Sequence, residues 1–319
     1  MTKNRVLDST RVLLENPKYV FIKPEKIDEA AAILSQDGWH IPDWKDNVYP
    51  EGDDNYVTDF FFLTNTINFA FTDFKTGQKY SQTYNGKEWS GAVGMVASIK
   101  KALEAGIPLL DASFLSNISR EQMSGIFRGN MEIPLLIQRL EIFREVGRVL
   151  SEKYDGHFHN LVNQSERLCF NEGRGIVERL TDDFPSFNDS NDYMGQKVIF
   201  NKRAQLAVGQ VHGRFLGERR EFVEDIGELT AFADYVLPKG LRELGILEYE
   251  KSLAERVDKQ IIIPAGSQEE LEIRASTIHT FEMLRQKLGL PNALALDGKI
   301  WYKFRKGGSP HHLTPTIAY

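Results

Sequence analysis

Two aspartates in the C-terminal third of the sequence, Asp234 and Asp297, stand among apolar and aromatic residues. Asp234 lies between Phe232 and Tyr235, and Asp297 is followed four residues later by Trp301. A carboxylate in such surroundings loses hydration free energy unless it is paired or used, so these acids are candidates for catalysis or ligand binding. The two acids therefore predict a pocket, and cleavage of a glycosidic bond is the chemistry that we favour there.

Both aspartates also have a structural interpretation, because an aspartate placed before a helix can accept hydrogen bonds from its free backbone N–H groups. Asp297 precedes Gly-Lys-Ile-Trp, and Asp234 precedes a short helix expected over residues 237–244. The structural and catalytic interpretations are compatible, since an acid at a helix N-terminus stays ionised. Both interpretations therefore stay open at this point.

Motifs of other catalytic classes are missing from the sequence. There is no HExxH pattern, and the pairs His157/His159 and His311/His312 are too local to indicate a metal site. No Walker phosphate loop and no GxSxG elbow occurs, and Cys169 has no histidine in a recognisable context. We therefore expect neither a metal ion nor an organic cofactor.

Composition narrows the choice of partners and compartment. The chain has 319 residues, 41% of them hydrophobic and 26% charged, as in ordinary globular proteins. A formal charge of −6 argues against binding of duplex nucleic acid, which relies on neutralising phosphates. A single cysteine, no apolar run of membrane-spanning length and no apolar segment behind the N-terminal Met-Thr-Lys-Asn-Arg predict a cytoplasmic protein without a membrane partner.

Helical periodicity dominates the rest of the chain. The pattern predicts helices over residues 5–16, 25–38, 93–104, 120–127, 134–153, 160–183, 202–215, 237–244, 248–258, 269–288 and 293–301. Asn85-Gly86 is a strong hairpin signal, so we expect a small antiparallel sheet near residues 67–90, with loops over 39–55 and 184–192. The sequence thus predicts a mainly α fold of the α+β type. We expect one compact domain, with N-terminal helices and the hairpin in 1–105 and a helical core in 106–319.

A dense group of phenylalanines between residues 56 and 74 is best interpreted as core. Asn65 and Asn68 lie within this group. An amide among aromatic rings can read the edge of a planar base, because it offers both a donor and an acceptor. Asn68 is therefore a candidate for ligand binding.

Several blocks of this sequence resemble, in order, those of the queuosine salvage family. They are Asn-Thr-Ile-Asn-Phe-Ala-Phe (65–71), Gly-Ile-Pro-Leu-Leu-Asp-Ala-Ser (106–113), Phe-Asn-Lys-Arg-Ala-Gln (200–205), Phe-Ala-Asp-Tyr to Leu-Glu-Tyr (232–249), Glu-Ile-Arg-Ala-Ser (272–276) and the segment 312–319. The resemblance covers nearly the whole chain. It implies an N-glycosidase that hydrolyses queuosine 5′-phosphate and releases queuine for salvage into tRNA modification.

The resemblance also implies a fold and a catalytic residue. The family's fold is similar to that of the helix-hairpin-helix DNA glycosylases, in which a Val-Asp-x-His-hydrophobic-Trp/Phe stretch after the hairpin carries the catalytic aspartate. Leu-Asp-Gly-Lys-Ile-Trp (296–301) is similar in form and position. This comparison favours Asp297 as the catalytic group, ahead of Asp234. The expected substrate-binding residues are Phe232, Asp234, Tyr235, Asn68, Lys202 and Trp301, with Lys202 as a partner for a phosphate or for a buried acid.

Five positions depart from the family pattern. Asn65 stands where the family usually has Asp, Thr72 where it has Trp, and Val236 where it has Arg, while Leu313 and Pro315 replace common arginines. These departures keep two alternatives open: a glycosylase for a different nucleotide or for the nucleoside, and a protein that binds queuine or another deazapurine without cleavage. A DNA glycosylase and a helical scaffold protein are less favoured, because of the acidic charge and the aromatic residues around two acids.

Overall fold

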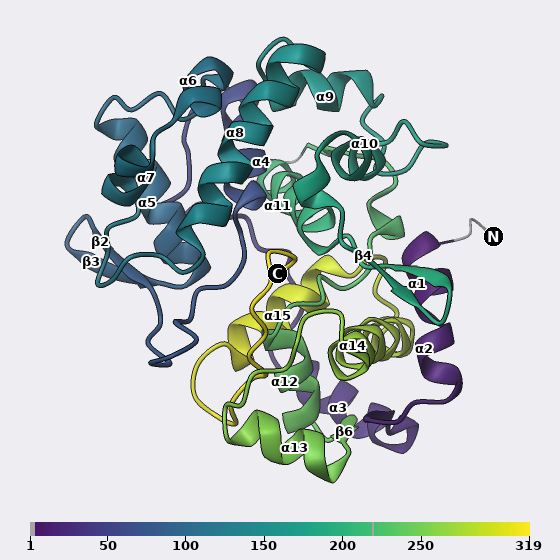
Figure 1. Cartoon of the computed structure of the whole chain (residues 1–319). Coiled ribbons are helices and arrows are strands. Elements are labelled where there is room, and N and C mark those ends of the chain that lie inside the picture. Colours follow the sequence, from purple (N-terminus) through teal and green to yellow (C-terminus); the bar gives the residue numbers. More distant parts are fainter. Residues whose placement is uncertain (1–3, 219) are drawn as a thin grey trace.

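The structure, a computed structural model, describes residues 4–218 and 220–319 (Figure 1). Residues 1–3, which begin the N-terminal stretch considered above, and Arg219 lie outside this description. Helices make up about half of the chain, which confirms the predicted mainly α class. Among the described residues, none of the helices combines the length and the hydropathy that a membrane crossing requires.

The helices follow one another with short connections. The α-helices are α1 (Arg5–Thr10), α2 (Val12–Glu15), α3 (Ile27–Leu34), α4 (Asp54–Thr66), α5 (Ala92–Glu104), α6 (Ala112–Asn117), α7 (Arg120–Ile126), α8 (Leu136–Lys153), α9 (Phe158–Gln164), α10 (Ile176–Asp183), α11 (Lys202–Leu216), α12 (Val236–Glu243), α13 (Lys251–Asp258), α14 (Gln268–Lys287) and α15 (Leu294–Phe304). Short 3₁₀ turns are η1 (Pro24–Lys26), η2 (Pro185–Phe187) and η3 (Ile226–Glu228).

Three antiparallel strand pairs accompany the helices. They are β1 (Val20–Ile22) with β6 (Leu247–Tyr249), β2 (Ser81–Tyr84) with β3 (Lys87–Ser90), and β4 (Ser190–Tyr193) with β5 (Gln196–Ile199). The β2–β3 hairpin turns at Asn85-Gly86, as predicted, with Tyr84 opposite Lys87. The β1–β6 pair joins segments more than 200 residues apart, and so ties the N-terminal helices to the C-terminal part of the chain.

Some expected elements are absent or divided. The first part of the sheet expected near residues 67–90 is reduced to a single bridge from Thr72 to Lys79. The preceding phenylalanine-rich segment forms helix α4, which is capped by Asp53 and was not predicted. The helix expected over 160–183 is divided into α9 and α10. Glu166 and Arg167 adopt left-handed backbone conformations there, and Asp225 accepts the N–H groups of the segment that follows. The expected loop at 184–192 ends in β4, and residues 247–249 form β6 rather than the first turn of a helix.

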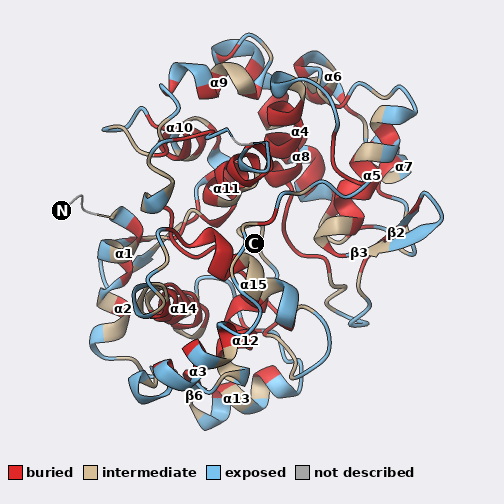
Figure 2. Ribbon diagram, turned by 180° about the vertical axis from the view of Figure 1, so that it is seen from behind, coloured by how far each residue is buried: buried red, intermediate tan, exposed pale blue. Residues whose placement is uncertain are grey.

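Two hydrophobic clusters make up the interior, and they divide the chain between them. The first lies among α4–α11 and contains the buried phenylalanines of α4, which confirms their interpretation as core. The second lies among α1–α3 and α12–α15. Figure 1 shows the purple N-terminal helices beside the green and yellow C-terminal ones, with the blue and teal helices forming the other half. Most residues of α4, α11, α12 and α14 are buried (Figure 2).

A buried arginine fixes the segment that follows α4. Arg139 on α8 donates to the backbone carbonyl oxygens of Ile67, Phe69 and Ala70, the last at 2.9 Å. Since side-chain donors satisfy these carbonyls, the segment after α4 can be buried without pairing as a strand. Its course places Asn68, which lies between these carbonyls in the sequence, in the wall of a cavity.

Candidate active site

A cavity of about 930 Å³, including the open space at its mouth, lies where the two hydrophobic clusters meet. All seven residues expected at the site from the sequence line it: Asn68, Lys202, Phe232, Asp234, Tyr235, Asp297 and Trp301. The structure thus brings together side chains from the segment after α4, from α11, from the segment before α12 and from α15.

Asp297 is held inside the wall of this cavity by helix α15. Its helix begins at Leu294, so Asp297 lies within the first turn and does not cap the helix as the structural interpretation proposed. Instead its Oδ2 accepts a hydrogen bond of 2.9 Å from the backbone N–H of Phe232. Burial raises the pKa of Asp297 from 3.8 to about 8, and the nearby charge of Asp234 adds to the rise. The carboxyl group therefore lies in a buried site where few groups can hydrogen-bond to it.

Asp234 combines the two interpretations that the sequence left open. Its Oδ1 accepts hydrogen bonds from the backbone N–H groups of Val236 and Leu237, at 2.7 and 3.0 Å, in the first turn of α12. The same residue lines the cavity. Burial raises the pKa of Asp234, while Lys202 and the two backbone donors oppose this change. Asp234 is thus a helix-capping residue whose carboxylate also faces the site.

Lys202 supplies positive charge to both acids. It is the first residue of α11, its side chain is buried, and its Nζ lies 3.5 Å from the carbonyl oxygen of Asn68. Burial lowers the pKa of Lys202 to about 8, and the charges of Asp234 and Asp297 act in the opposite direction. Among the described residues that line the cavity, Lys202 alone carries a cationic side chain. One lysine therefore faces two carboxyl groups.

Aromatic rings form the apolar part of the wall. Phe232 packs tightly against α11, where a Cβ on Gly209 would come within 2.7 Å of its ring, so this contact requires glycine. Tyr235 packs against the ring of His311, with ring centroids 4.3 Å apart. Trp301 makes a side-chain hydrogen-bonding contact with Asp234. These rings offer stacking surfaces for a planar ligand beside the two acids.

The two asparagines after the phenylalanine group have different positions. Asn68 lines the cavity, whereas Asn65 is fully buried behind it. Asn65 Nδ2 donates to the Oε1 of Gln210 at 2.7 Å, and its Oδ1 accepts from Asn68 Nδ2 at 3.1 Å. Asn65 therefore orients two amides of the cavity wall.

Several further residues line the wall; the aromatic residues of segment 39–55 among them were expected mainly to pack over the core. The further residues are Pro42, Trp44, Tyr49, Thr64, Phe71, Ala92, Val93, Val96, Leu206, Gln210, Leu294, Gly298, Tyr302 and Tyr319. A signal for some of them exists in the helical spacing. Lys202, Leu206 and Gln210 recur every four residues on α11, so they share one face of that helix. Tyr302 likewise follows Gly298 by four residues on α15.

The departures near the C-terminal end lie away from the main cavity wall. Leu313 is buried beside Tyr235 and Tyr319 in a smaller neighbouring cavity, and Pro315 is exposed. Val236 is buried in the second cluster and gives its N–H to Asp234. Thr72 takes part in the bridge with Lys79 and lines the small cavity.

These features define a class of protein: a mainly helical protein whose cavity is lined by two acids, one lysine and several aromatic rings. The sequence profile of the family described as queuosine salvage protein matches residues 48–301. This chain belongs to that family, as its sequence resemblance implied.

Relatives from distant organisms share almost the full length of the chain. A protein of Sphaerobacter thermophilus named queuosine 5′-phosphate N-glycosylase/hydrolase is 36% identical, over 98% of this chain and 97% of its own. Proteins of the same name from Mus musculus and Bos taurus are 31% and 29% identical, each over 98% of both chains. The similarity therefore extends over all the segments that form the cavity.

Proposed function

We propose that this protein is an N-glycosidase that hydrolyses queuosine 5′-phosphate and releases queuine for salvage into tRNA modification. The named relatives, similar over nearly their whole length, support the reaction and the substrate. The observation that carries the proposal for this chain is the position of Asp297, a buried carboxyl group in the wall of a cavity with Asp234, Lys202 and aromatic rings. The reaction requires no metal ion or cofactor in this proposal.

Asp297 acts on the sugar. As the bond between the ribose C1′ and the base nitrogen breaks, its electron pair leaves with the base and positive charge develops on the ribose. A carboxylate fixed beside C1′ stabilises that charge, either by its field or by transient attack on C1′. Water finally adds its oxygen to C1′ and gives one proton to the base, so that the products are ribose 5-phosphate and queuine.

The raised pKa of Asp297 fits this role. In the free protein, burial favours the neutral form of the carboxyl group. Developing positive charge on the ribose favours the ionised form, so the interaction between Asp297 and the substrate strengthens as the bond breaks. An interaction that is stronger in the transition state than in the ground state lowers the barrier.

Asp234 and the rings hold the base. Queuine is a 7-deazapurine, which has no N7 to protonate, so contacts with its other edges must assist departure. Asp234 accepts hydrogen bonds from the guanine-like N1–H and amino group, and Asn68 reads a further edge. Phe232, Tyr235 and Trp301 supply stacking faces, each worth about 1–3 kcal/mol by comparison with other base–aromatic contacts.

Lys202 is assigned here as the counter-charge to the acids rather than as the main phosphate ligand. The charge of Asp234 is the strongest influence that opposes the effect of burial on its pKa, and its Nζ lies beside the backbone of Asn68. A lysine at this position keeps the net charge of the site near −1 when both acids are ionised. That balance favours a ligand that carries or develops positive charge.

The reaction takes place in the cytoplasm in this proposal, which the single cysteine of the chain supports, since Cys169 is free and buried. Neither duplex nucleic acid nor a membrane takes part.

A base-release assay tests the proposal. Purified protein is incubated with queuosine 5′-phosphate or with the queuosine nucleoside, and free queuine is separated chromatographically. We expect queuine and ribose 5-phosphate in equal amounts from the nucleotide. Tight binding of queuine by calorimetry without any release from either compound would instead identify a binding protein and overturn the proposal.

A further inference from the structure

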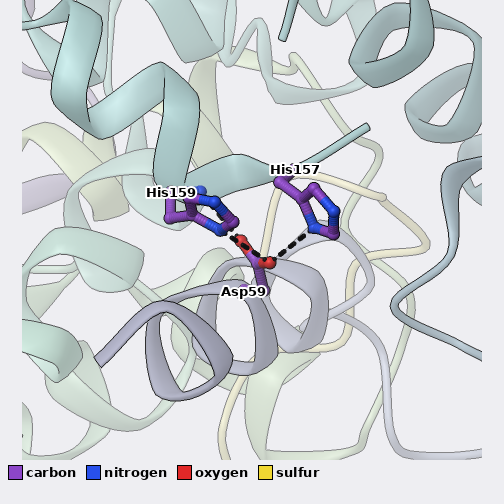
Figure 3. A group of neighbouring side chains, drawn as sticks. All are labelled: Asp59, His157 and His159. Atoms are coloured by element: carbon purple, nitrogen blue, oxygen red, sulfur yellow. Dashed lines mark hydrogen bonds and ion pairs between the residues drawn. The ribbon is translucent and has the colours of Figure 1, made fainter. Parts of the chain in front are cut away.

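A second group of polar side chains lies outside the cavity, where α4 meets the start of α9. Asp59 projects from α4, and His157 and His159 lie at the N-terminus of α9 with their imidazoles directed at its carboxylate (Figure 3). The sequence suggested that the two histidines were too local for a metal site. The fold brings them a third partner from a distant segment.

The ligand atoms of the three side chains converge. The Nδ1 atoms of His157 and His159 lie 2.9 and 3.0 Å from the same oxygen, Asp59 Oδ2, and all three ligand atoms lie within 4.8 Å of one another. The other oxygen, Oδ1, is anchored by the backbone N–H of His159 at 2.8 Å. The carboxylate is therefore oriented by the backbone, and Oδ2 is turned toward both rings.

The spacing suits a transition metal after a small expansion. Metal–nitrogen and metal–oxygen bonds of roughly 2.0–2.2 Å in tetrahedral geometry place neighbouring ligand atoms roughly 3.3–3.5 Å apart. The two Nδ1–Oδ2 distances are only a few tenths of an ångström shorter. The two rings are stacked, with centroids 4.8 Å apart, and a rotation of both rings would bring the three ligand atoms to the required spacing.

We propose that Asp59, His157 and His159 form a binding site for one divalent transition-metal ion of the zinc class. Two imidazole nitrogens and one carboxylate oxygen are ligands that such ions accept, whereas Mg²⁺ and Ca²⁺ prefer sites built from oxygen alone. The His157 side chain is 45% exposed, so water reaches the site and completes the coordination. Neutral rings bind the metal through Nδ1 and carry their proton on Nε2.

The position of the site predicts its effect. Helix α4 carries Asp59 in its middle and Thr64, a residue of the cavity wall, near its end. A metal ion joining Asp59 to both histidines would link α4 to α9 at a point outside the cavity. We therefore expect the ion to stabilise the fold, while none of its ligands touches the substrate site. The inference does not depend on the proposed glycosidase activity.

The test uses the full chain freed of metal by a chelator, then titrated with Zn²⁺ by calorimetry and by thermal unfolding. We expect one Zn²⁺ per chain and a Tm that rises with Zn²⁺ concentration. His157→Ala should weaken Zn²⁺ binding at least tenfold and abolish the Tm shift. Its half-exposed side chain makes this variant less disruptive than a change at the buried Asp59. His40→Ala, which removes an exposed histidine elsewhere, is the matched control and should bind Zn²⁺ like the unchanged protein.

Three results would overturn the inference. They are equal Zn²⁺ affinity in His157→Ala and His40→Ala, absence of Zn²⁺ binding to the unchanged protein, and a Tm shift with Mg²⁺ as large as that with Zn²⁺. Base release measured on the same samples distinguishes this failure from failure of the proposed function, because the two readouts involve different residues.

Discussion

Two buried aspartates of this protein, Asp297 and Asp189, have similar exposure and opposite surroundings. They are 8% and 6% exposed. Asp189 receives both ends of the Arg274 guanidinium group, at 2.7 and 2.6 Å, and also the backbone N–H of Lys202 at 3.0 Å. Asp297 accepts one backbone hydrogen bond, and the described residues offer it no guanidinium partner.

The difference distinguishes a carboxylate that stabilises the fold from one that is available to a ligand. A buried carboxylate needs a paired charge and several donors to stay ionised without cost. Asp189 has these, and it joins the segment before β4 to α14 and to the start of α11. Asp297 lacks them, and burial shifts its pKa to about 8. A strongly perturbed acid in a cavity wall marks a functional candidate.

Asp297→Asn gives the largest expected effect. The substitution preserves shape but removes the charge that stabilises the ribose, so base release from queuosine 5′-phosphate should fall by about 10³-fold or more. The rate is measured chromatographically at saturating substrate, with Asp182→Asn, an exposed aspartate on α10, as the control. Activity within tenfold of the unchanged protein would remove Asp297 from the catalytic role.

The same substitution at Asp189 should act on stability. Asp189→Asn leaves the Arg274 guanidinium buried without its carboxylate partner, and breaking such a pair costs about 3–5 kcal/mol. The free energy of unfolding is measured by denaturant titration. Glu270, 3.7 Å from Arg274, partly compensates for the lost carboxylate, so we expect a cost at the lower end of this range. If Asp189→Asn has the same free energy of unfolding as the unchanged protein, Asp189 does not have the structural role that distinguishes it from Asp297.

Asp234 combines a structural role with a binding role, and its substitution should mainly change the affinity for queuine. Asp234→Ala removes an acceptor for the base, so binding of free queuine should weaken by roughly 10–100-fold in calorimetry. The change also removes the cap of α12, at a cost of about 1 kcal/mol. Asp234→Asn keeps an oxygen for the cap while losing the charge, so it separates the two roles. Unchanged queuine affinity in both variants would exclude Asp234 from base binding.

The parts of the fold that the sequence predicted are those with local signals. Helical periodicity placed α8, α11, α12 and α14, and Asn85-Gly86 placed the β2–β3 turn. Strands β1 and β6 contain only three residues each, too few to show an alternating pattern, and their pairing depends on segments distant in sequence. The division of the expected 160–183 helix likewise depends on a distant residue, Asp225.

The site could be predicted from residue type and family resemblance where the residues lie close in sequence, on one helix face or, like Asn68 and Lys202, within a block that resembles the family. Phe232, Asp234 and Tyr235 adjoin one another, and Asp297 and Trp301 are one turn apart on α15. Tyr49 was interpreted mainly as packing over the core and Tyr319 was not named as a site residue, because both lie in irregular segments whose course shows no local pattern. Asp59 lies 98 residues from His157, and no local pattern connects the two.

Stability and activity should respond in opposite directions to the titration of Asp297. Its pKa is about 8 in the folded protein and near 3.8 when unfolded. Below pH 4 both states bind the proton, so this group does not alter stability there. As pH rises from 4 to 8 the unfolded state loses the proton more readily, and the stability contributed by the neutral buried carboxyl group is lost progressively.

Asp297→Asn does not titrate, so its stability relative to the unchanged protein should increase from pH 4 to pH 8 and then level off. We expect a Tm difference of a few degrees at pH 8 and almost none at pH 4, measured by calorimetry across this range. Base release by the unchanged protein should rise over the upper part of the same range, because the ionised form is the one that stabilises the ribose. A Tm difference independent of pH would show that Asp297 is already ionised in the folded protein at pH 4, and that the fold compensates its charge as it does that of Asp189.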